Sequence, residues 1–227
     1  MERGEFLGRV SLFQELAPRD RQDIQGLFHE QRPERDQFIF LEGDEAEYVY
    51  IVVGGKVKIV KQAAGGKEMI LEVFGPGDVF GGAALLLSRH PATAVCMEPG
   101  ALLCLPRLDY LALLKRFPLM AFQVIELLRQ RLHEAHQAIR GLAAERVETR
   151  VARLLFKLAD KTGVPSQGGI RLALHLTRQD IADMVGCTLE TAIRILSRWQ
   201  KEGLIKTEGG VITILSRQEL ERLLGAS

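Results

Sequence analysis

Two side chains in the last third of the chain have the chemistry to read the edges of nucleic-acid bases. Glu190 and Arg194 stand four residues apart, so on a helix both reach the same side. An arginine can donate to the O6 and N7 atoms of guanine, and a carboxylate can accept from the N4 amino group of cytosine. The same spacing also produces an ordinary salt bridge on a solvated helix. The surrounding residues must decide between the two interpretations.

The residues before and within this segment predict two short helices joined by a glycine turn. Thr177, with an acid at Asp180, is a variant of the capping box, and Gly186 suits the left-handed position that ends a helix. Thr188 can then cap a second helix that runs to about Lys201. We expect this second helix to bury one face, namely Ala192, Ile195, Leu196 and Trp199. Such a unit matches the helix-turn-helix that places its second helix in the major groove, and it favours base reading.

Two apolar residues flank the pair on the second helix. Leu189 and Ile193 could contact thymine methyl groups, or they could pack on a neighbouring element. After the helix, apolar runs on both sides of Gly209-Gly210 predict a hairpin, which would form a wing. Ser216 then caps a last helix.

Earlier in the chain, from about Gln37 to Pro106, short apolar runs alternate with glycine and proline. The expected strands are Phe38–Leu41, Tyr48–Val53, Val57–Val60, Met69–Phe74, Thr93–Met97 and Ala101–Leu105. This spacing leaves no room for crossover helices, so the strands must pair in an antiparallel sheet. The predicted fold class is α+β, with an N-terminal antiparallel β-roll of the jelly-roll type.

A long helix is expected from Pro118, with apolar residues stepping by three and four as in a coiled coil. The stripe consists of Phe122, Ile125, Leu128, Leu132, Ala135, Ile139 and Leu142. Burial against a second copy predicts a homodimer; the alternative is a helix packed wholly on its own domain. Gly141 and the charged stretch Glu145–Glu148 predict a joint. The expected domains are a β-roll at 1–117, a dimerisation helix at 118–144 and a winged helix-turn-helix at 145–227.

Composition excludes several classes of protein. The 227 residues are 47% hydrophobic and 26% charged, as in soluble globular chains and unlike disordered ones. The net charge of +1 argues against a uniformly basic nucleic-acid coat protein. Residues 145–227 nevertheless hold 13 basic and 10 acidic residues, a net +3, against 17 and 19, a net −2, in residues 1–144. The C-terminal part is therefore the expected partner of a polyanion.

Location and redox chemistry follow from what the chain lacks. No apolar run approaches the ~20 residues of a membrane span, and the first residues lead into no signal-type core. We therefore expect a cytoplasmic protein with no membrane partner. Cys96, Cys104 and Cys187 are too few for a disulfide framework and lack metal-ligand spacing. They are interpreted as buried, inert thiols.

The order of these parts resembles the CRP/FNR superfamily of bacterial transcription regulators over nearly the whole chain. The stretches that carry the resemblance are Phe40–Asp44, Tyr50–Lys58, Gly77–Gly82, Leu176–Ala182 and Val185–Arg194. The resemblance implies a non-enzymatic, effector-responsive protein that binds a double-stranded DNA operator and acts with RNA polymerase. It also implies that Glu190 and Arg194 read bases. The residues implied to hold phosphates are Arg178, Gln179, Thr188 and Thr191. Leu189 stands where the cyclic-AMP receptor type has an arginine, and it is similar to the anaerobic-regulator branch.

The sensor positions depart from the cyclic-nucleotide pattern of this family. The positions implied for the effector are Gly81, Gly82, Ala83, Ala92 and Thr93. Where cyclic-nucleotide binders of the family have a Gly-Glu pair for the ribose, this chain has Gly81-Gly82. Where they have an Arg-Ser or Arg-Thr pair for the phosphate, it has Ala92-Thr93. Arg89, three residues upstream, is the candidate substitute for the missing cation. A buried phosphate without its cation would be strongly disfavoured, so the sequence argues against cyclic AMP.

Other cofactors of the family are judged by their ligands. An iron–sulfur cluster needs four thiolates, and the chain has three cysteines. Haem stays open, because an imidazole could serve as its axial ligand; the histidines are His29, His90, His133, His136 and His175. The effector is thus an unknown small molecule. Two alternatives remain open: a DNA-binding regulator whose sensor is inactive, and a cyclic-nucleotide-controlled signalling adaptor.

Overall fold

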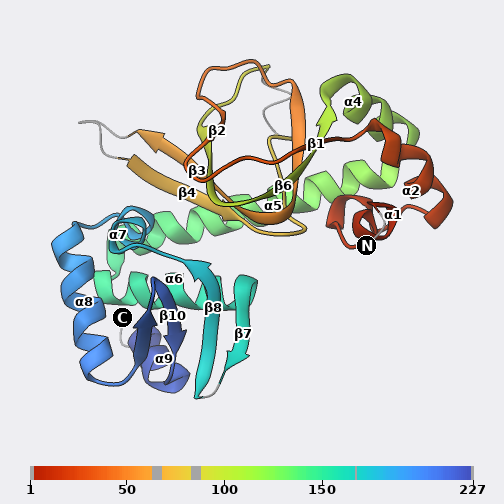
Figure 1. The fold of residues 1–227 in the computed structure, drawn as a ribbon. Helices are drawn as coiled ribbons and strands as arrows, with labels where there is room; N and C mark the ends of the chain where they lie inside the picture. Colours follow the sequence, from red (N-terminus) through yellow and green to blue (C-terminus); the bar gives the residue numbers. More distant parts are fainter. Residues whose placement is uncertain (1–2, 63–67, 83–87, 167, 226–227) are drawn as a thin grey trace. The chain divides into compact units, whose positions relative to one another are not determined.

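The structure is a computed structural model that describes residues 3–62, 68–82, 88–166 and 168–225, with the backbone alone along 137–144 and at 225. The chain divides into two compact units, Met1–His133 and Glu134–Ser227 (Figure 1). The division falls within the long helix α5 (Pro118–Ala144). The domain boundaries expected at 117 and 144 stay predictions. Among the described helices, none has the length and apolar character needed to cross a membrane.

The first unit contains a six-stranded sheet in which every strand pair is antiparallel. Its strands are β1 (His29–Gln31), β2 (Phe38–Phe40), β3 (Tyr48–Gln62), β4 (Glu68–Phe74), β5 (Val79–Phe80) and β6 (Thr93–Pro106). The order is β1-β6-β3-β4 (Figure 1). Strand β2 pairs with β6, and β5 pairs with β3. The predicted α+β class with an antiparallel N-terminal sheet is confirmed. We call this sheet the β-roll.

Two predicted breaks between strands are wrong. The expected strands on either side of Gly54-Gly55 are parts of β3, and those on either side of Pro99-Gly100 are parts of β6. The glycines allow a close approach of the two strands, because a Cβ on Gly100 would lie 1.9 Å from the Gly54 carbonyl oxygen. The pairing register shifts at this point and absorbs the extra residues. Glycine here marks bulges within long strands rather than turns.

Short helices cover the end of the β-roll where β3 begins and β6 ends. They are α1 (Arg3–Leu7), η1 (Ser11–Phe13), α2 (Pro18–Ile24), η2 (Gln25–Leu27) and α4 (Arg107–Arg116). Pro18 occupies the first turn of α2, where its fixed φ suits the start of a helix. One apolar core joins these helices to the strands and the start of α5; its buried members include Leu7, Phe13, Ile24, Val49, Leu105, Tyr110 and Met120. Each such side chain stabilises the unit by roughly 1.5–3 kcal/mol.

Three elements of this unit were not predicted. β1 exposes all three of its residues, and β5 is two residues long, so neither shows an alternating pattern. Helix α4 buries Leu113 but exposes Leu108 almost completely. Its apolar residues therefore do not mark a single face.

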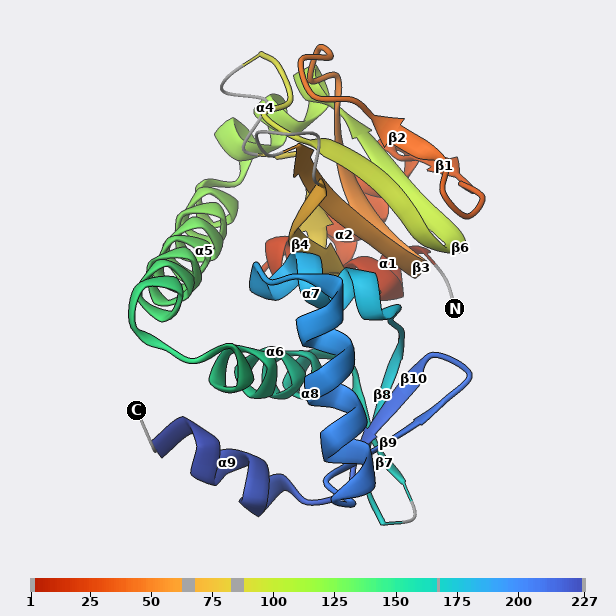
Figure 2. The same ribbon diagram turned by 90° about the vertical axis from the view of Figure 1, so that its left-hand side faces the viewer.

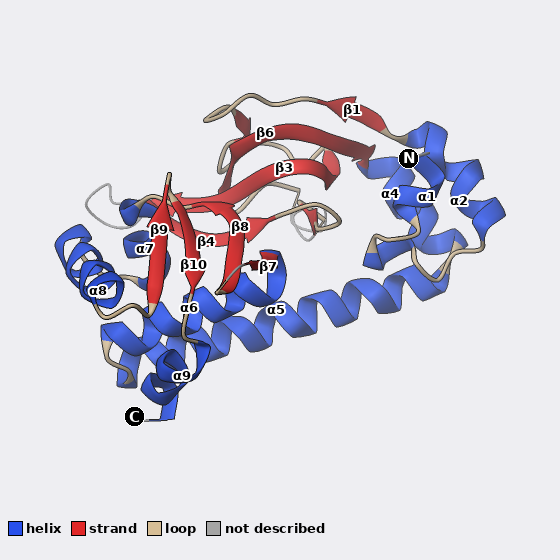
Figure 3. Ribbon diagram, turned by 60° about the horizontal axis from the view of Figure 1, so that its bottom comes forward, coloured by secondary structure: helices blue, strands red, loops and turns tan. Residues whose placement is uncertain are grey.

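The second unit contains α6 (Val147–Thr162) and the elements that follow it in the chain (Figure 3). These are β7 (Gly163–Ser166), β8 (Gly169–His175), α7 (Arg178–Val185), α8 (Leu189–Lys201), β9 (Ile205–Glu208), β10 (Val211–Ile214) and α9 (Arg217–Gly225). The sheet order is β7-β8-β10-β9. The hairpin β9–β10 turns at Gly209-Gly210, where both glycines have positive φ, and confirms the predicted wing. β7 and β8 were not predicted.

The joint lies later than Gly141. Helix α5 continues through Gly141 to Ala144, and α6 begins at Val147, so the joint falls within the predicted stretch Glu145–Glu148 and not at Gly141. Only Glu145 and Arg146 separate the two helices, and Arg146 has an extended backbone. A single glycine inside a helix weakens it by roughly 1 kcal/mol, which the flanking turns can outweigh.

Candidate DNA-binding and sensor sites

The turn between α7 and α8 is held by local hydrogen bonds at both helix starts. Asp180 N–H donates to the Thr177 hydroxyl at 3.0 Å, and Thr177 N–H donates to the Asp180 carboxylate at 2.8 Å, which completes the predicted capping box. Gly186 adopts the left-handed conformation, with φ 67°. Thr188 accepts from Thr191 N–H at 3.3 Å and caps α8. All three predicted signals are confirmed.

Helix α8 packs against α7 through one apolar face (Figure 2). The buried residues are Ala192, Ile195, Leu196 and Trp199, as predicted. The largest of them, Trp199, is 1% exposed. Because this stripe fixes the rotation of α8 about its axis, it also decides which residues face outward.

The outward face of α8 carries most of the residues predicted to bind DNA. Thr188, Leu189, Glu190, Ile193 and Arg194 are exposed, and Thr191 is half-buried. Leu189 and Ile193 are 36% and 43% exposed, so neither is buried against a neighbouring element. Polar and apolar groups thus lie together at the N-terminal half of one helix, where the helix dipole is positive.

The two residues predicted at the start of α7 have partners within the second unit. Arg178 is half-buried, its guanidinium reaches the Thr207 hydroxyl of β9 at 3.5 Å, and burial lowers its pKa. The Gln179 amide donates to the carboxylate of buried Asp183 at 2.8 Å. Thr207 and Asp183 were not predicted, because nothing in their sequence context indicates which α7 side chain they meet.

Helix α5 exposes the apolar stripe predicted to form a dimer. Phe122 is 66%, Ile125 61% and Leu132 58% exposed; Leu128 and Ala135 are also exposed. Leu119 lies one turn earlier, is 58% exposed, and was not predicted. The side chains of Ile139 and Leu142 fall outside the described residues.

Two of the positions implied for the effector are glycines against the β3 strand. Gly81 has φ 80°, and a Cβ there would lie 3.0 Å from the Tyr50 ring. A Cβ on Gly82 would meet the Tyr110 hydroxyl at 3.6 Å. Ala83 falls outside the described residues. A side chain at Gly81 would therefore be strained, both by its positive φ and by the nearby Tyr50 ring.

The other two implied positions offer no cation. Ala92 is buried, and the Thr93 hydroxyl accepts from Glu42 N–H at 2.9 Å. Arg89, the candidate substitute, donates to the Gly43 carbonyl at 2.7 Å. These residues do not make the cationic cradle that a cyclic phosphate needs.

The interior of the β-roll is filled by a chain of aromatic rings. The ring centroids are 5.3 Å apart for Phe74–Phe80, 5.0 Å for Phe80–Tyr50, 5.5 Å for Tyr50–Phe40 and 3.5 Å for Phe40–His90. Arg131 of α5 closes the chain at the Phe74 end. Its guanidinium lies 5.1 Å from the ring centroid of Phe74 and donates to the Val79 carbonyl at 2.6 Å. Helix α5 is thus attached to the β-roll through the side chain of Arg131.

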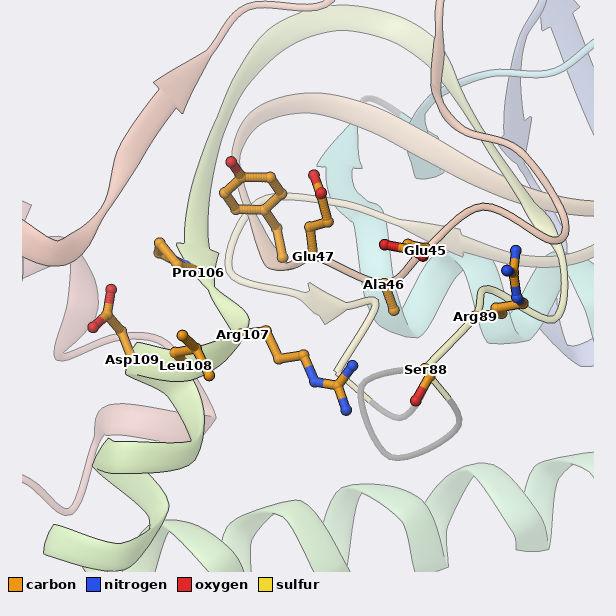
Figure 4. A pocket seen from close by; sticks show the side chains of 10 residues that line it. Glu45, Ala46, Glu47, Ser88, Arg89, Pro106, Arg107, Leu108 and Asp109 are labelled. Atoms are coloured by element: carbon orange, nitrogen blue, oxygen red, sulfur yellow. The ribbon is translucent and has the colours of Figure 1, made fainter.

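A cavity of about 650 Å³ lies between the start of β3 and the start of α4 (Figure 4). Its charged lining comprises Glu45, Glu47, Asp109, Arg89 and Arg107. Arg107 extends from the start of α4 toward Ser88. With three carboxylates beside two guanidinium groups, the cavity lacks the positive excess that would favour a phosphate.

Histidines and cysteines are dispersed. His29, His133, His136 and His175 are exposed. The described residues contain no group of three or more His, Cys, Asp or Glu arranged to hold a metal ion. All three cysteines are buried, as predicted, and burial raises the pKa of the Cys104 thiol to about 12.

His90 differs from the other histidines because it is 2% exposed and stacked on Phe40. Its Nε2 atom has no hydrogen-bond partner among the described residues. Burial lowers the pKa of His90, although the carboxylate of Asp44 partly opposes this. In the unfolded chain the imidazole therefore takes up a proton at higher pH than in the folded protein. The contribution of neutral His90 to the free energy of unfolding is complete above about pH 6.5 and is lost as the pH falls below that value.

We expect the thermal midpoint of the protein to fall as pH is lowered from 7.5 to 5.5, and His90→Phe to lose part of this dependence. The phenyl ring keeps the stack on Phe40 but cannot be protonated. Thermal unfolding followed by circular dichroism at several pH values measures both. His136→Gln, at an exposed position, should retain the wild-type profile. An unchanged profile in His90→Phe would contradict the assignment.

Comparison with known proteins agrees with this arrangement. Residues 30–117 match the model of the cyclic nucleotide-binding domain, and residues 149–223 match that of the Crp-like helix-turn-helix domain. The Cyclic AMP receptor protein of Thermus thermophilus is 32% identical over 213 residues, which cover 93% of this chain and 95% of that protein. The regulatory protein HlyX of Actinobacillus pleuropneumoniae is 28% identical over 208 residues, or 90% and 86%.

A solved structure shares the fold. FixK2 of Bradyrhizobium japonicum superposes with a TM-score of 0.78 at 28% identity, covering 88% of this chain and 98% of that one. Its likeness extends over both units, and the two domain matches have the same order as the β-roll and the helix-turn-helix. The chain therefore belongs to the CRP/FNR family of transcription regulators, a family that binds DNA and is not enzymatic.

Proposed function

We propose that this protein is a homodimeric transcription factor that reads an inverted-repeat operator through α8 and responds to an effector through its β-roll. The observation that carries the proposal is the outward face of α8, where Glu190 and Arg194 each stand next to an exposed apolar residue. We expect it to act in the cytoplasm, with RNA polymerase as its partner at the promoter.

The chemistry of that face suggests the bases. Arg194 requires a guanine and Glu190 a cytosine, which on opposite strands fit a TGA-like core. Leu189 cannot hydrogen-bond to a base, so the position before the core should be thymine, whose methyl group offers an apolar contact. The half-site is therefore TTGA-like. Two such half-sites, related by a dyad and about 34 Å apart, follow from the dimer.

Selection from a random DNA pool, followed by sequencing, tests this operator. We expect an inverted repeat with TTGA-like half-sites. Recovery of a non-palindromic site, or of a G·C pair strictly required opposite Leu189, would contradict the proposed operator. Protein with Trp199→Ala, which loses the buried face of α8, serves as the control for non-specific recovery.

Cyclic AMP is not the expected effector, although that name belongs to a 32% identical relative. Gly82 and Ala92 lack the carboxylate and the guanidinium that the nucleotide would need, and Arg89 is engaged by Gly43. Isothermal calorimetry should show no binding at micromolar cyclic AMP. Micromolar or tighter affinity would overturn this and point to another cation in the sensor.

One observation favours a regulator whose sensor is inactive. Arg131 joins α5 directly to the β-roll through the Val79 carbonyl and the Phe74 ring, so the chain's own residues already hold this part of α5 against the sheet. Such a protein would bind its operator at full affinity as purified, and metabolite extracts would not change that affinity. The adaptor alternative has lost its basis, because residues 149–223 match a DNA-binding domain.

A further inference from the structure

Arg150, in the first turns of α6, donates to three main-chain carbonyls from two separate segments. Its Nε reaches the Val185 oxygen at 3.0 Å, and its Nη2 reaches the Gly186 oxygen at 3.4 Å. Its Nη1 reaches the Glu145 oxygen at 3.3 Å. The side chain is partly buried. One guanidinium therefore spans the joint and the turn between α7 and α8.

The three acceptor carbonyls lie at the ends of two different helices. Glu145 is the residue after α5 ends, and Val185 and Gly186 close α7 just before α8 begins. The α7 carbonyls lie at the negative end of the helix dipole, which favours a cation there. The planar fork of an arginine can donate in several fixed directions at once, whereas a lysine ammonium cannot reproduce them.

Neighbouring residues of α6 hold the other helices of the second unit. The Glu148 carboxylate accepts from Arg198 of α8 at 3.1 Å, and the Thr149 hydroxyl donates to the Leu223 carbonyl of α9 at 3.3 Å. The first turn of α6 is thus a platform for α7, α8 and α9. Of the three consecutive residues 148–150, Arg150 is the one whose side chain also holds the joint.

We propose that Arg150 is a positioning residue that transmits the conformation of the joint at Glu145–Arg146 to α8. A change in the direction of α5 must either move the Glu145 carbonyl or break its bond to Arg150. If the bond holds, the turn at Val185–Gly186 moves with the joint, and α8 with it. Arg150 thereby sets the direction of α8 relative to the end of α5, and so the spacing at which a dimer places its two recognition helices.

The test rests on the proposed function, because it needs the selected operator. Affinity is measured by fluorescence anisotropy for the inverted repeat, for repeats with two base pairs added or removed between half-sites, and for a single half-site. Arg150→Lys keeps the charge and removes the fork. Arg153→Lys is the matched control, because Arg153 lies on the same helix and pairs only with the Glu145 side chain among the described residues.

We expect Arg150→Lys to lower the ratio of repeat to half-site affinity about tenfold, as for the loss of one charge-assisted hydrogen bond. Its preference for one spacing should flatten, half-site affinity should stay within about twofold, and Arg153→Lys should behave as the wild type. Should Arg150→Lys not fold, Arg150→Gln, which keeps a single donor group, gives the same comparison.

Other results would overturn the assignment. Equal losses on repeat and half-site, together with a lower thermal midpoint, would show that Arg150 only stabilises the second unit. An unchanged ratio, or the same loss in Arg153→Lys, would also exclude a positioning role. If the wild type itself does not prefer the repeat over the half-site, the proposed function fails before any variant is made, and this assignment fails with it.

Discussion

Replacing Phe122 and Leu132 together with glutamate is expected to give a monomer whose affinity for the inverted repeat is lower by at least about 100-fold. Both side chains are exposed on α5, at 66% and 58%. Their burial in a dimer would contribute roughly 1.5–3 kcal/mol per side chain, and four such side chains meet in the pair of helices. A monomer also loses the linked second half-site, an effect on the order of 10²–10⁴ in affinity.

Light scattering at micromolar concentration gives the oligomeric state, and anisotropy gives the affinity. Glu126→Gln is the matched control, because Glu126 lies on α5 in an exposed pair with Arg129 and outside the apolar stripe. It should remain dimeric. A wild type that is monomeric both with and without operator would contradict the homodimer.

Arg194→Ala is expected to weaken operator binding by roughly 1–3 kcal/mol and to relax the preference for guanine in each half-site. The reason is the loss of a bidentate contact to the O6 and N7 atoms of that base. Competition binding against operators substituted at each position measures the effect. The loss should be confined to the guanine position, and other positions should keep their preferences.

Arg178→Ala provides the contrast. Arg178 lies at the start of α7 beside Thr207 of the wing, where a phosphate contact is expected. Its loss should weaken all sequences alike and lower the salt slope by about one. A sequence-dependent loss in Arg178→Ala, or a uniform loss in Arg194→Ala, would exchange the two roles and contradict the assignment.

The helix-turn-helix could be predicted from sequence because its signals act over three or four residues. Thr177 and Asp180 cap each other within a single turn, and Gly186 takes a backbone conformation that other residues rarely adopt. The buried face of α8 follows from a period of 3.6 residues. These capping and periodicity signals lie wholly within the segment, so contacts with the rest of the chain change the local structure little.

The β-roll was predicted in class but not in detail. Gly54-Gly55 and Pro99-Gly100 have the composition of turns, and only the pairing of β3 with β6 shows that each lies within one continuous, bulged strand. Likewise, the low helix propensity of glycine suggested a joint at Gly141, yet α5 continues past it to Ala144. Strand pairing and helix length depend on tertiary contacts that cannot be predicted from the local sequence.

The contacts of single polar side chains were decided by the tertiary structure alone. Every residue presents a carbonyl, so nothing in the sequence indicates that Arg150 would meet those of Glu145 and Val185, or Arg131 that of Val79. Nor does it indicate which histidine is enclosed, because the burial of His90 depends on Phe40, fifty residues earlier. The sequence by itself determined the family, the helix-turn-helix and the outward residues of α8, since these rest on short-range patterns. Packing at long range decided which carbonyls Arg131 meets in the β-roll and Arg150 meets in the second unit, because a hydrogen bond forms only where folding brings donor and acceptor together.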